Sequence, residues 1–375
     1  MIDLIYLMLW ALSLNNMKMK GLNSFFDDYI DLENTLPVKG IFVWMIFFRH
    51  WSGYIKKRGF GKLISRGIDA GLKQNIVSLF LFYSGFGINQ SFRAKGSIYI
   101  KKLPKKSALI YTKSQIIILF FLLNNKILGI KTSFASYKSA LIFKKGIGNS
   151  YWFAFEIIML YIYSFLSFIY INKKYNLIGI IILNIICYFH FHYVSNYYHI
   201  KEFFSVDTII CFVSGFYYSF FKSCVEKIIM KNDITYFGLI ILLFYQYYKY
   251  YKISGVNIYY NSISNLFFSL FSILITMKIR FKNDFLIFLT SHSYTIYLSQ
   301  RVVMIYFSRK GYFQENVFIN FFFEFFIVIL IALVFDKYTS FLDYFFIKKD
   351  FKLKQFRFKP IMNKKNEKIK LLQIQ

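Results

Sequence analysis

Residues 36–54 read LPVKGIFVWMIFFRHWSGY, a stretch that is apolar enough to cross a bilayer yet carries Lys39, Arg49 and His50. Lys39 and His50 are eleven positions apart, so at ~100° per residue both side chains lie on one face of a helix. Ionisable groups inside a membrane segment are energetically costly and indicate function by default. The structural alternatives are an imidazole satisfied by a neighbouring helix and a lysine that extends to the membrane interface.

The composition predicts the rest of the architecture. The chain has 375 residues, of which 57% are hydrophobic, and contains only three prolines. Apolar runs of nearly 20 residues recur along it, which is typical of an all-α, polytopic transmembrane helical bundle. We expect about ten spans, near residues 37–55, 70–90, 107–127, 151–171, 177–194, 205–222, 235–251, 259–279, 284–307 and 318–340.

The same pattern divides the chain into three parts. Residues 1–36 form an apolar segment, of which 1–15 is too short for a typical span, followed by a connector. Residues 37–342 form the transmembrane domain, and residues 343–375 form a basic tail.

Charge predicts the orientation. Lys and Arg outnumber Asp and Glu by 47 to 18, and the cations lie mostly between the apolar runs. This placement indicates a positive-inside topology and contact with anionic membrane lipids rather than with nucleic acid. The basic tail is therefore expected in the cytoplasm, although the loop after the first span is also basic and would then lie outside.

Five motifs carry a family resemblance. They are the Lys39-to-His50 spacing, SGFG at 84–87 with YIKKLPKKS after it, NSYWFAFEIIMLYIYSF at 149–165, CFVSGFYYSFFKSCVEK at 211–227 and SHSYTIYLSQR at 291–301. In this order, over about residues 25–340, they resemble the acyltransferase-3 family, bacterial membrane enzymes that O-acylate surface polysaccharides. The resemblance implies transfer of an acyl group, most often acetyl, from acyl-CoA to a hydroxyl of a cell-envelope glycan or a lipid-linked sugar. It also implies the bacterial inner membrane, with no permanently bound cofactor and no metal.

The resemblance assigns His50 as the general base and Lys39 as its basic partner. An imidazole is suited to removing a hydroxyl proton near neutral pH. For acyl-CoA at the inner face, the candidate ligands are the SGFG turn, in which glycines permit close backbone approach, and the basic turn after it. These candidates are Ser84, Gly85, Gly87, Lys101, Lys102, Lys105 and Lys106. Many family members have arginines where this turn has lysines, which supply charge without a bidentate fork, and such a basic loop can also serve topology alone.

A second set of candidates follows from depth along the expected spans. At 1.5 Å per residue, His50, Glu156, Arg301 and Glu324 all fall roughly 8–9 Å below the outer surface. Charged groups in a bilayer face the bundle interior and pair with one another. We therefore predict that Arg301 pairs with Glu324, and that Glu156 and His50 line an outer acceptor cavity together with Trp152.

Other histidines and two other functions remain to be weighed. His190, His192 and His199 are expected in an interfacial aromatic belt, because positions two apart do not share a helix face, and His292 is expected to be a satisfied local polar group. A flippase or polymerase of lipid-linked glycans would also be polytopic and basic. A transporter with a proton-relay histidine should show inverted repeats, and none is visible.

Overall fold

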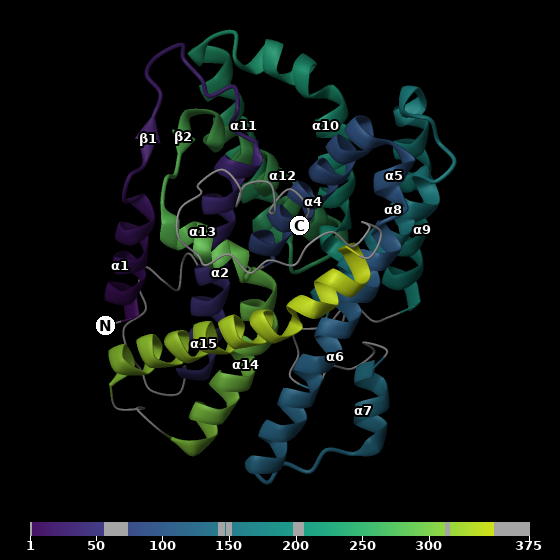
Figure 1. Cartoon of the computed structure of the whole chain (residues 1–375). Coiled ribbons are helices and arrows are strands. Elements are labelled where there is room, and N and C mark those ends of the chain that lie inside the picture. Colours follow the sequence, from purple (N-terminus) through teal and green to yellow (C-terminus); the bar gives the residue numbers. More distant parts are fainter. Residues whose placement is uncertain are drawn as a thin grey trace, which may run out of the picture.

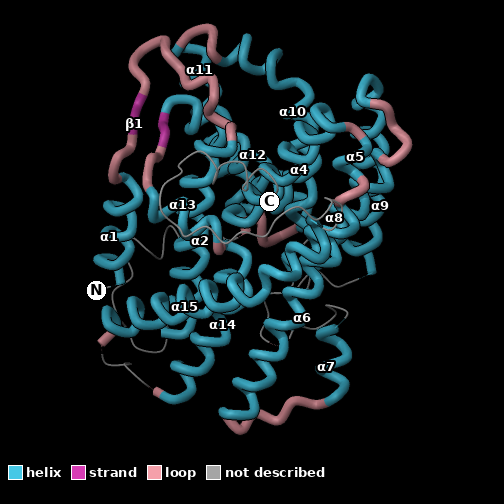
Figure 2. The backbone as a smooth tube through the Cα atoms, in the orientation of Figure 1, coloured by secondary structure: helices cyan, strands magenta, loops and turns pink. Residues whose placement is uncertain are grey.

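The computed structural model describes residues 2–55, 74–141, 147, 152–197, 206–311 and 316–348. Most of these residues are helical, which confirms the all-α fold class (Figures 1 and 2). The longer helices are α1 (Ile2–Leu14), α2 (Leu32–Ile55), α4 (Asn75–Lys95), α6 (Leu103–Ile127), α8 (Trp152–Phe168), α9 (Asn176–Tyr197), α10 (Ile209–Ile229), α11 (Asp233–Ile253), α12 (Ile258–Lys278), α14 (Ser293–Lys310) and α15 (Val317–Asp343). The shorter elements are β1 (Lys18–Met19), α5 (Ser97–Ile100), α7 (Phe134–Leu141), η2 (Lys173–Tyr175), η3 (Val206–Thr208), β2 (Ile279–Arg280), α13 (Asp284–Ser291) and the π-helical turn η4 (Tyr344–Lys348).

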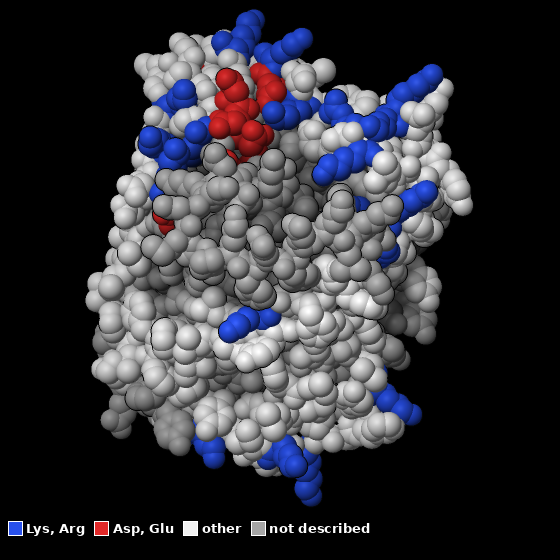
Figure 3. Space-filling view, viewed as in Figure 1, with Lys and Arg blue, Asp and Glu red and all other residues white. Residues whose placement is uncertain are grey.

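The connections at one end of the bundle are joined by polar contacts. Lys173 Nζ donates to the carbonyl of Ala94 at 2.7 Å, and Arg93 Nη1 donates to the carbonyl of Ser219 at 3.0 Å. At the same end, β1 pairs antiparallel with β2, so that Lys18 lies opposite Arg280 (Figure 1). We call this the basic end, because it gathers the cations of residues 93–105, 173–174, 222–231 and 278–282. Figure 3 shows Lys and Arg at this upper end around a group of acidic side chains.

In the part of the chain that the structure describes, five helical segments are long and apolar enough to cross a membrane. They are Ser97–Ile127, Lys173–Val194, Val206–Ile229, Ile258–Lys278 and Val317–Phe346. Each corresponds to one of the expected spans. On α9, large apolar side chains such as Ile181, Ile185 and Phe189 are exposed, as expected for a helix that faces lipid.

The number of about ten spans is not confirmed by length and composition. The expected spans near residues 37–55, 70–90 and 235–251 are helical as α2, α4 and α11, but they do not meet the criteria for a spanning helix. The expected span at 151–171 is the 17-residue α8. The expected span at 284–307 is wrong as one helix, because the chain breaks at His292 into α13 and α14.

Three further boundaries differ from the sequence prediction. The SGFG motif is not a turn but lies inside α4, which continues to Lys95. The basic stretch 101–106 is not a single turn either, because Pro104 in the first turn of α6 starts that helix early and makes Lys105 and Lys106 helical. The loop expected at 128–150 contains α7. Most of the predicted tail, residues 349–375, lies outside the described residues.

Gly85 and Gly215 bring α4 and α10 into backbone contact. A Cβ on Gly85 would lie 2.0 Å from the carbonyl oxygen of Phe212, and a Cβ on Gly215 would lie 2.2 Å from that of Phe82. Therefore α4 and α10 cross with their backbones touching, as small residues permit in membrane bundles. The close approach that the sequence suggested for a ligand at Gly85 is made by α10 instead.

The central helix is α2, which is buried along most of its length. A Cβ on Gly40 would lie 2.1 Å from the carbonyl oxygen of Leu286, so α13 packs directly on α2. The indoles of Trp44 and Trp51 donate to Ser13 at 2.9 Å and to Asn320 at 2.7 Å. These bonds fix α2 against α1 and α15, and the helix that carries Lys39 and His50 is thereby held from several sides.

Asp233, at the first residue of α11, makes an ion pair at the basic end. Lys278 Nζ lies 2.6 Å from its carboxylate, and the backbone N–H of Asn23 donates to it at 2.9 Å. These hydrogen bonds, the one from Lys278 above all, lower the pKa of Asp233. The ionised carboxylate therefore stabilises the fold above the ordinary aspartate pKa of about 4, and this contribution is lost as the pH falls through the lowered value.

We expect Asp233→Asn to unfold at a lower temperature than the wild type at pH 7, with the difference narrowing below about pH 4 as the wild-type carboxylate is protonated. Thermal unfolding in detergent between pH 3 and 7 measures this. A difference that stays constant over the whole range would show that Asp233 contributes through packing instead.

Candidate functional site

His50 lies in the C-terminal half of α2 and faces α14. The centre of its ring is 6.3 Å from that of Tyr297, and its Nδ1 is buried without a hydrogen-bond partner among the described residues. Arg49 and Arg301 are the cations that act on the ring, and the amide of Gln300 interacts with it. A buried ring nitrogen that has no partner is available to exchange a proton with a bound molecule.

Arg301 and Glu324 both interact with a third residue, Tyr54. Arg301 forms a hydrogen bond with Tyr54, and Glu324 acts electrostatically on the same phenol. In the described part of the chain, the ion pairs do not include Arg301 with Glu324, so the direct pair expected from the sequence is not formed. Instead, Arg301 Nε and Glu324 Oε2 remain without hydrogen-bond partners there. Tyr54, which the sequence did not single out, is the residue that both side chains share.

Aromatic contacts connect the first turn of α8 to His50. Trp152 packs edge-on against Phe153, and Phe153 packs against Tyr297 with 5.5 Å between ring centres. Tyr297 in turn contacts His50. Trp152 is thus joined to the His50 region through two rings.

Glu156 has different surroundings. It is fully buried, and the charged group that acts on it is Asp207 of η3. No described contact joins Glu156 to His50. That these two residues share a cavity therefore stays a prediction.

Lys39 and His50 have different neighbours on the same helix. The Lys39 ammonium lies 5.3 Å from the centre of the Tyr83 ring on α4, whereas His50 faces Tyr297 of α14. Among the described residues, Lys39 forms no ion pair with a carboxylate. Its described contact is the aromatic ring, which attracts a cation through its quadrupole.

Ser84 and Lys106 are brought together by a residue that the sequence did not indicate. Ser84 Oγ donates to the hydroxyl of Tyr161 at 3.4 Å, and Lys106 acts electrostatically on the same phenol. Lys106 also lies 5.1 Å from the centre of the Tyr99 ring. The result is a polar cluster among α4, α5, α6 and α8, just inside the basic end. With 32 tyrosines in the chain, nothing in the sequence distinguishes Tyr161.

The remaining acyl-CoA candidates are divided by exposure. Lys101 and Lys105 are exposed and Lys102 is half-buried at the basic end, whereas Lys106 is buried. At Gly87 a Cβ would meet nothing within 4 Å, so this glycine borders open space. The outer lysines and Gly87 are therefore accessible, while Gly85 is filled by α10.

The other histidines have local partners. His292 Nδ1 lies 2.5 Å from Asp336, and Thr295 donates to the other oxygen of that carboxylate at 2.6 Å. His190 Nδ1 is bonded to the Tyr163 hydroxyl at 2.8 Å, and His192 stacks on Tyr188. His292 is thus satisfied as expected, while His199 lies outside the described residues.

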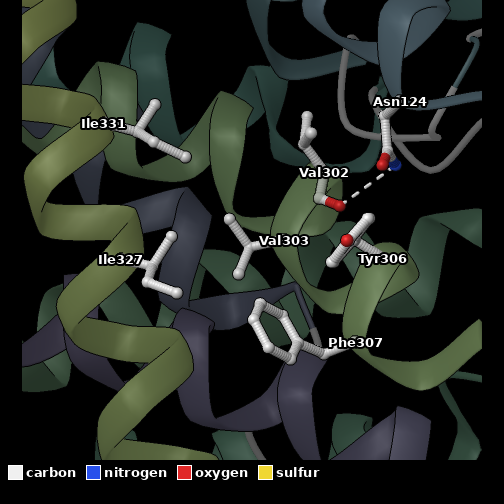
Figure 4. A pocket seen from close by; sticks show the side chains of 7 residues that line it. All are labelled: Asn124, Val302, Val303, Tyr306, Phe307, Ile327 and Ile331. Carbon is white, nitrogen blue, oxygen red and sulfur yellow. Dashed lines mark hydrogen bonds between the residues drawn. The ribbon is translucent and has the colours of Figure 1, made fainter. Parts of the chain in front are cut away.

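An apolar pocket of about 300 Å³ lies among α6, α14 and α15 (Figure 4). Val302, Val303, Tyr306 and Phe307 of α14 face Ile327 and Ile331 of α15 across it, with Asn124 of α6 at one side. Asn124 Nδ2 donates to the carbonyl of Val302 at 3.2 Å. Apart from Asn124 and the hydroxyl of Tyr306, the side chains around the pocket are apolar.

Comparison with known proteins gives no assignment: no family model matches the chain, and neither a curated protein nor a solved structure shows significant similarity to it.

Proposed function

We propose that this chain is an integral-membrane O-acyltransferase that moves an acyl group, most simply acetyl, from acyl-CoA to a hydroxyl of a cell-envelope glycan or lipid-linked sugar. The observation that carries the proposal is the unpartnered, buried Nδ1 of His50 beside Arg301 and Arg49. In this proposal the bundle crosses a bacterial inner membrane about ten times, with the C-terminus in the cytoplasm.

The chemistry requires a base and a positive charge in the same place. His50 takes the proton of the acceptor hydroxyl as its oxygen attacks the thioester carbonyl. The C–O bond of the new ester forms, the C–S bond breaks, and the departing thiolate receives the proton from His50 to give free CoA. The guanidinium of Arg301 would stabilise the negative charge that develops on the carbonyl oxygen.

The donor and acceptor would approach from opposite ends. The phosphates of acyl-CoA are attracted to Lys101, Lys102 and Lys105 at the basic end, and the acyl arm passes the cluster of Ser84, Tyr161 and Lys106 and the Lys39 ammonium. The acceptor hydroxyl reaches His50 from the other end. Arg301, Glu324 and Trp152 border that route.

The test is transfer of radiolabelled acetyl from acetyl-CoA to glycan in membranes that contain the protein. We expect label in alkali-labile glycan esters, and none in membranes that lack the protein. Glycan that moves across the membrane or lengthens without gaining label would favour the flippase or polymerase alternative.

We expect Lys101→Ala, Lys102→Ala and Lys105→Ala in combination to raise the KM for acetyl-CoA several-fold, because they remove charge that attracts phosphate. The difference in KM between the variant and the wild type should shrink at high salt, because salt screens the attraction of the wild-type lysines for phosphate. A matched control removes Lys126, Lys131 and Lys138, which lie near the opposite end of α6. If both triple variants change the KM equally, the lysines at the basic end serve topology alone.

A further inference from the structure

Two carboxyl groups, on α8 and on η3, are buried beside one apolar cluster. Glu156 of α8 is 0% exposed and Asp207 of η3 is 1% exposed. Their sequence neighbours Ile157, Val206 and Ile209 belong to one apolar cluster, and Asp207 acts electrostatically on Glu156. Neither carboxyl has a described contact with a lysine or arginine. Two ionised carboxylates in such surroundings would each lack a counter-charge.

The oxygens of this site have too few donors. Both Glu156 carboxylate oxygens, Asp207 Oδ1 and the side-chain oxygen of Asn265 are buried without hydrogen-bond partners in the described chain. Asn261 donates to Asp207 Oδ2, and Asn265 Nδ2 donates to the backbone carbonyl of Asp207 at 3.2 Å. Four buried oxygens without partners, beside which the described residues supply no cation, indicate that a positive species is missing.

The other titratable groups around the pair are neutral in their ordinary states. Tyr163 of α8 and Cys187 of α9 interact electrostatically with Glu156, and Cys211 of α10 interacts electrostatically with Asp207. Tyr163 is itself hydrogen-bonded to His190. None of these groups supplies a fixed positive charge to the carboxylates.

We propose that Glu156 and Asp207, with Asn265, form a binding site for one small cation, either a proton or Na⁺, inside the bundle. A proton on one carboxyl would turn it into a donor for the other. A sodium ion would instead be coordinated by the carboxylate and amide oxygens. Buried acid groups with these roles are characteristic of ion and proton sites in membrane proteins. The site stands on these contacts alone and does not depend on acyl transfer.

The test compares thermal unfolding of the purified wild type in detergent with that of Glu156→Gln and Asp207→Asn. Without sodium, a proton site should lower the wild-type unfolding temperature by about 3–6 °C between pH 6 and pH 8.5, because the folded state binds one proton more than the unfolded state. For a sodium site, NaCl at pH 8.5 should raise that temperature, whereas choline chloride at equal ionic strength should not. Both variants should lose the response, and Glu33→Gln, a change at an exposed carboxyl, should keep it.

A second measurement needs no variant. Dicyclohexylcarbodiimide reacts with protonated buried carboxyls, so mass spectrometry of the treated wild type should find the adduct on Glu156 or Asp207. The yield should fall with rising pH for a proton site and with added Na⁺ for a sodium site. The proposal would be overturned if the unfolding temperatures of the wild type and Glu156→Gln changed equally with pH and with Na⁺. It would also be overturned if neither carboxyl formed an adduct.

Discussion

Replacing His50 by alanine should lower acyl transfer by about 100- to 10,000-fold, the range expected when a general base is removed. The loss should appear in kcat, because the imidazole assists proton transfer in the transition state and does not contribute to binding of the substrate in the ground state. Transfer of labelled acetyl from acetyl-CoA to glycan, at matched protein levels in membranes, measures the effect. Trp51 and Ser52, which follow His50 in α2, remain buried in the variant, so the fold should be retained.

His192→Ala is the matched control for this prediction. His192 is also a histidine on a long helix, but its ring is exposed and stacks on Tyr188. This variant should transfer acetyl at the wild-type rate. Near-normal activity of His50→Ala would remove His50 from the mechanism, and equal losses in both variants would point to a general effect on folding.

The largest effect on stability is expected at Gly85. A methyl group at this position would lie 2.0 Å from the carbonyl oxygen of Phe212, so α4 and α10 must move apart along their crossing. Overpacking of this kind costs about 1–3 kcal/mol or more when the backbone itself must shift. We expect Gly85→Ala to lower the unfolding temperature in detergent and the amount of folded protein in membranes. Gly215→Ala should do the same from the other side of the crossing.

Gly87 provides the comparison, because it lies in the same helix two residues away. A Cβ there meets nothing within 4 Å, and alanine favours a helix over glycine by about 0.5–1 kcal/mol. Gly87→Ala should therefore be as stable as the wild type or slightly more stable. If Gly85→Ala were equally well tolerated, the helices would not be in contact at this crossing.

The helices were predictable where the chain repeats one local pattern. Long apolar runs bounded by lysines gave the all-α class and the positions of α6, α9, α10, α12 and α15. The break at His292 was not predictable, because Asp336, which holds the imidazole at the start of α14, is 44 residues further along the chain. The extension of α4 through SGFG was missed for a similar reason. Glycines read locally suggest a turn, whereas the reason for Gly85 is the backbone of Phe212.

The same distinction applies to the candidate site. Lys39 and His50 could be selected from the sequence because ionisable side chains within an apolar run are rare and costly. Tyr54, Tyr161 and Asp207 could not, since their importance depends on neighbours that only the folded chain supplies. Depth along the helices predicted a direct pair of Arg301 with Glu324, but it could not show that Tyr54 is the group on which both act.

The packing of α2 also has a consequence for biogenesis. His50 leaves the ribosome well before its contacts Tyr297, Gln300 and Arg301, which are about 250 residues further on. At 5–20 residues per second, roughly 12–50 s pass before these partners are made. During that interval Lys39, Arg49 and His50 must be accommodated by water, lipid headgroups or an insertase rather than by their own fold. The side of α2 that carries His50 is thus enclosed only after the residues of α14 have been synthesised.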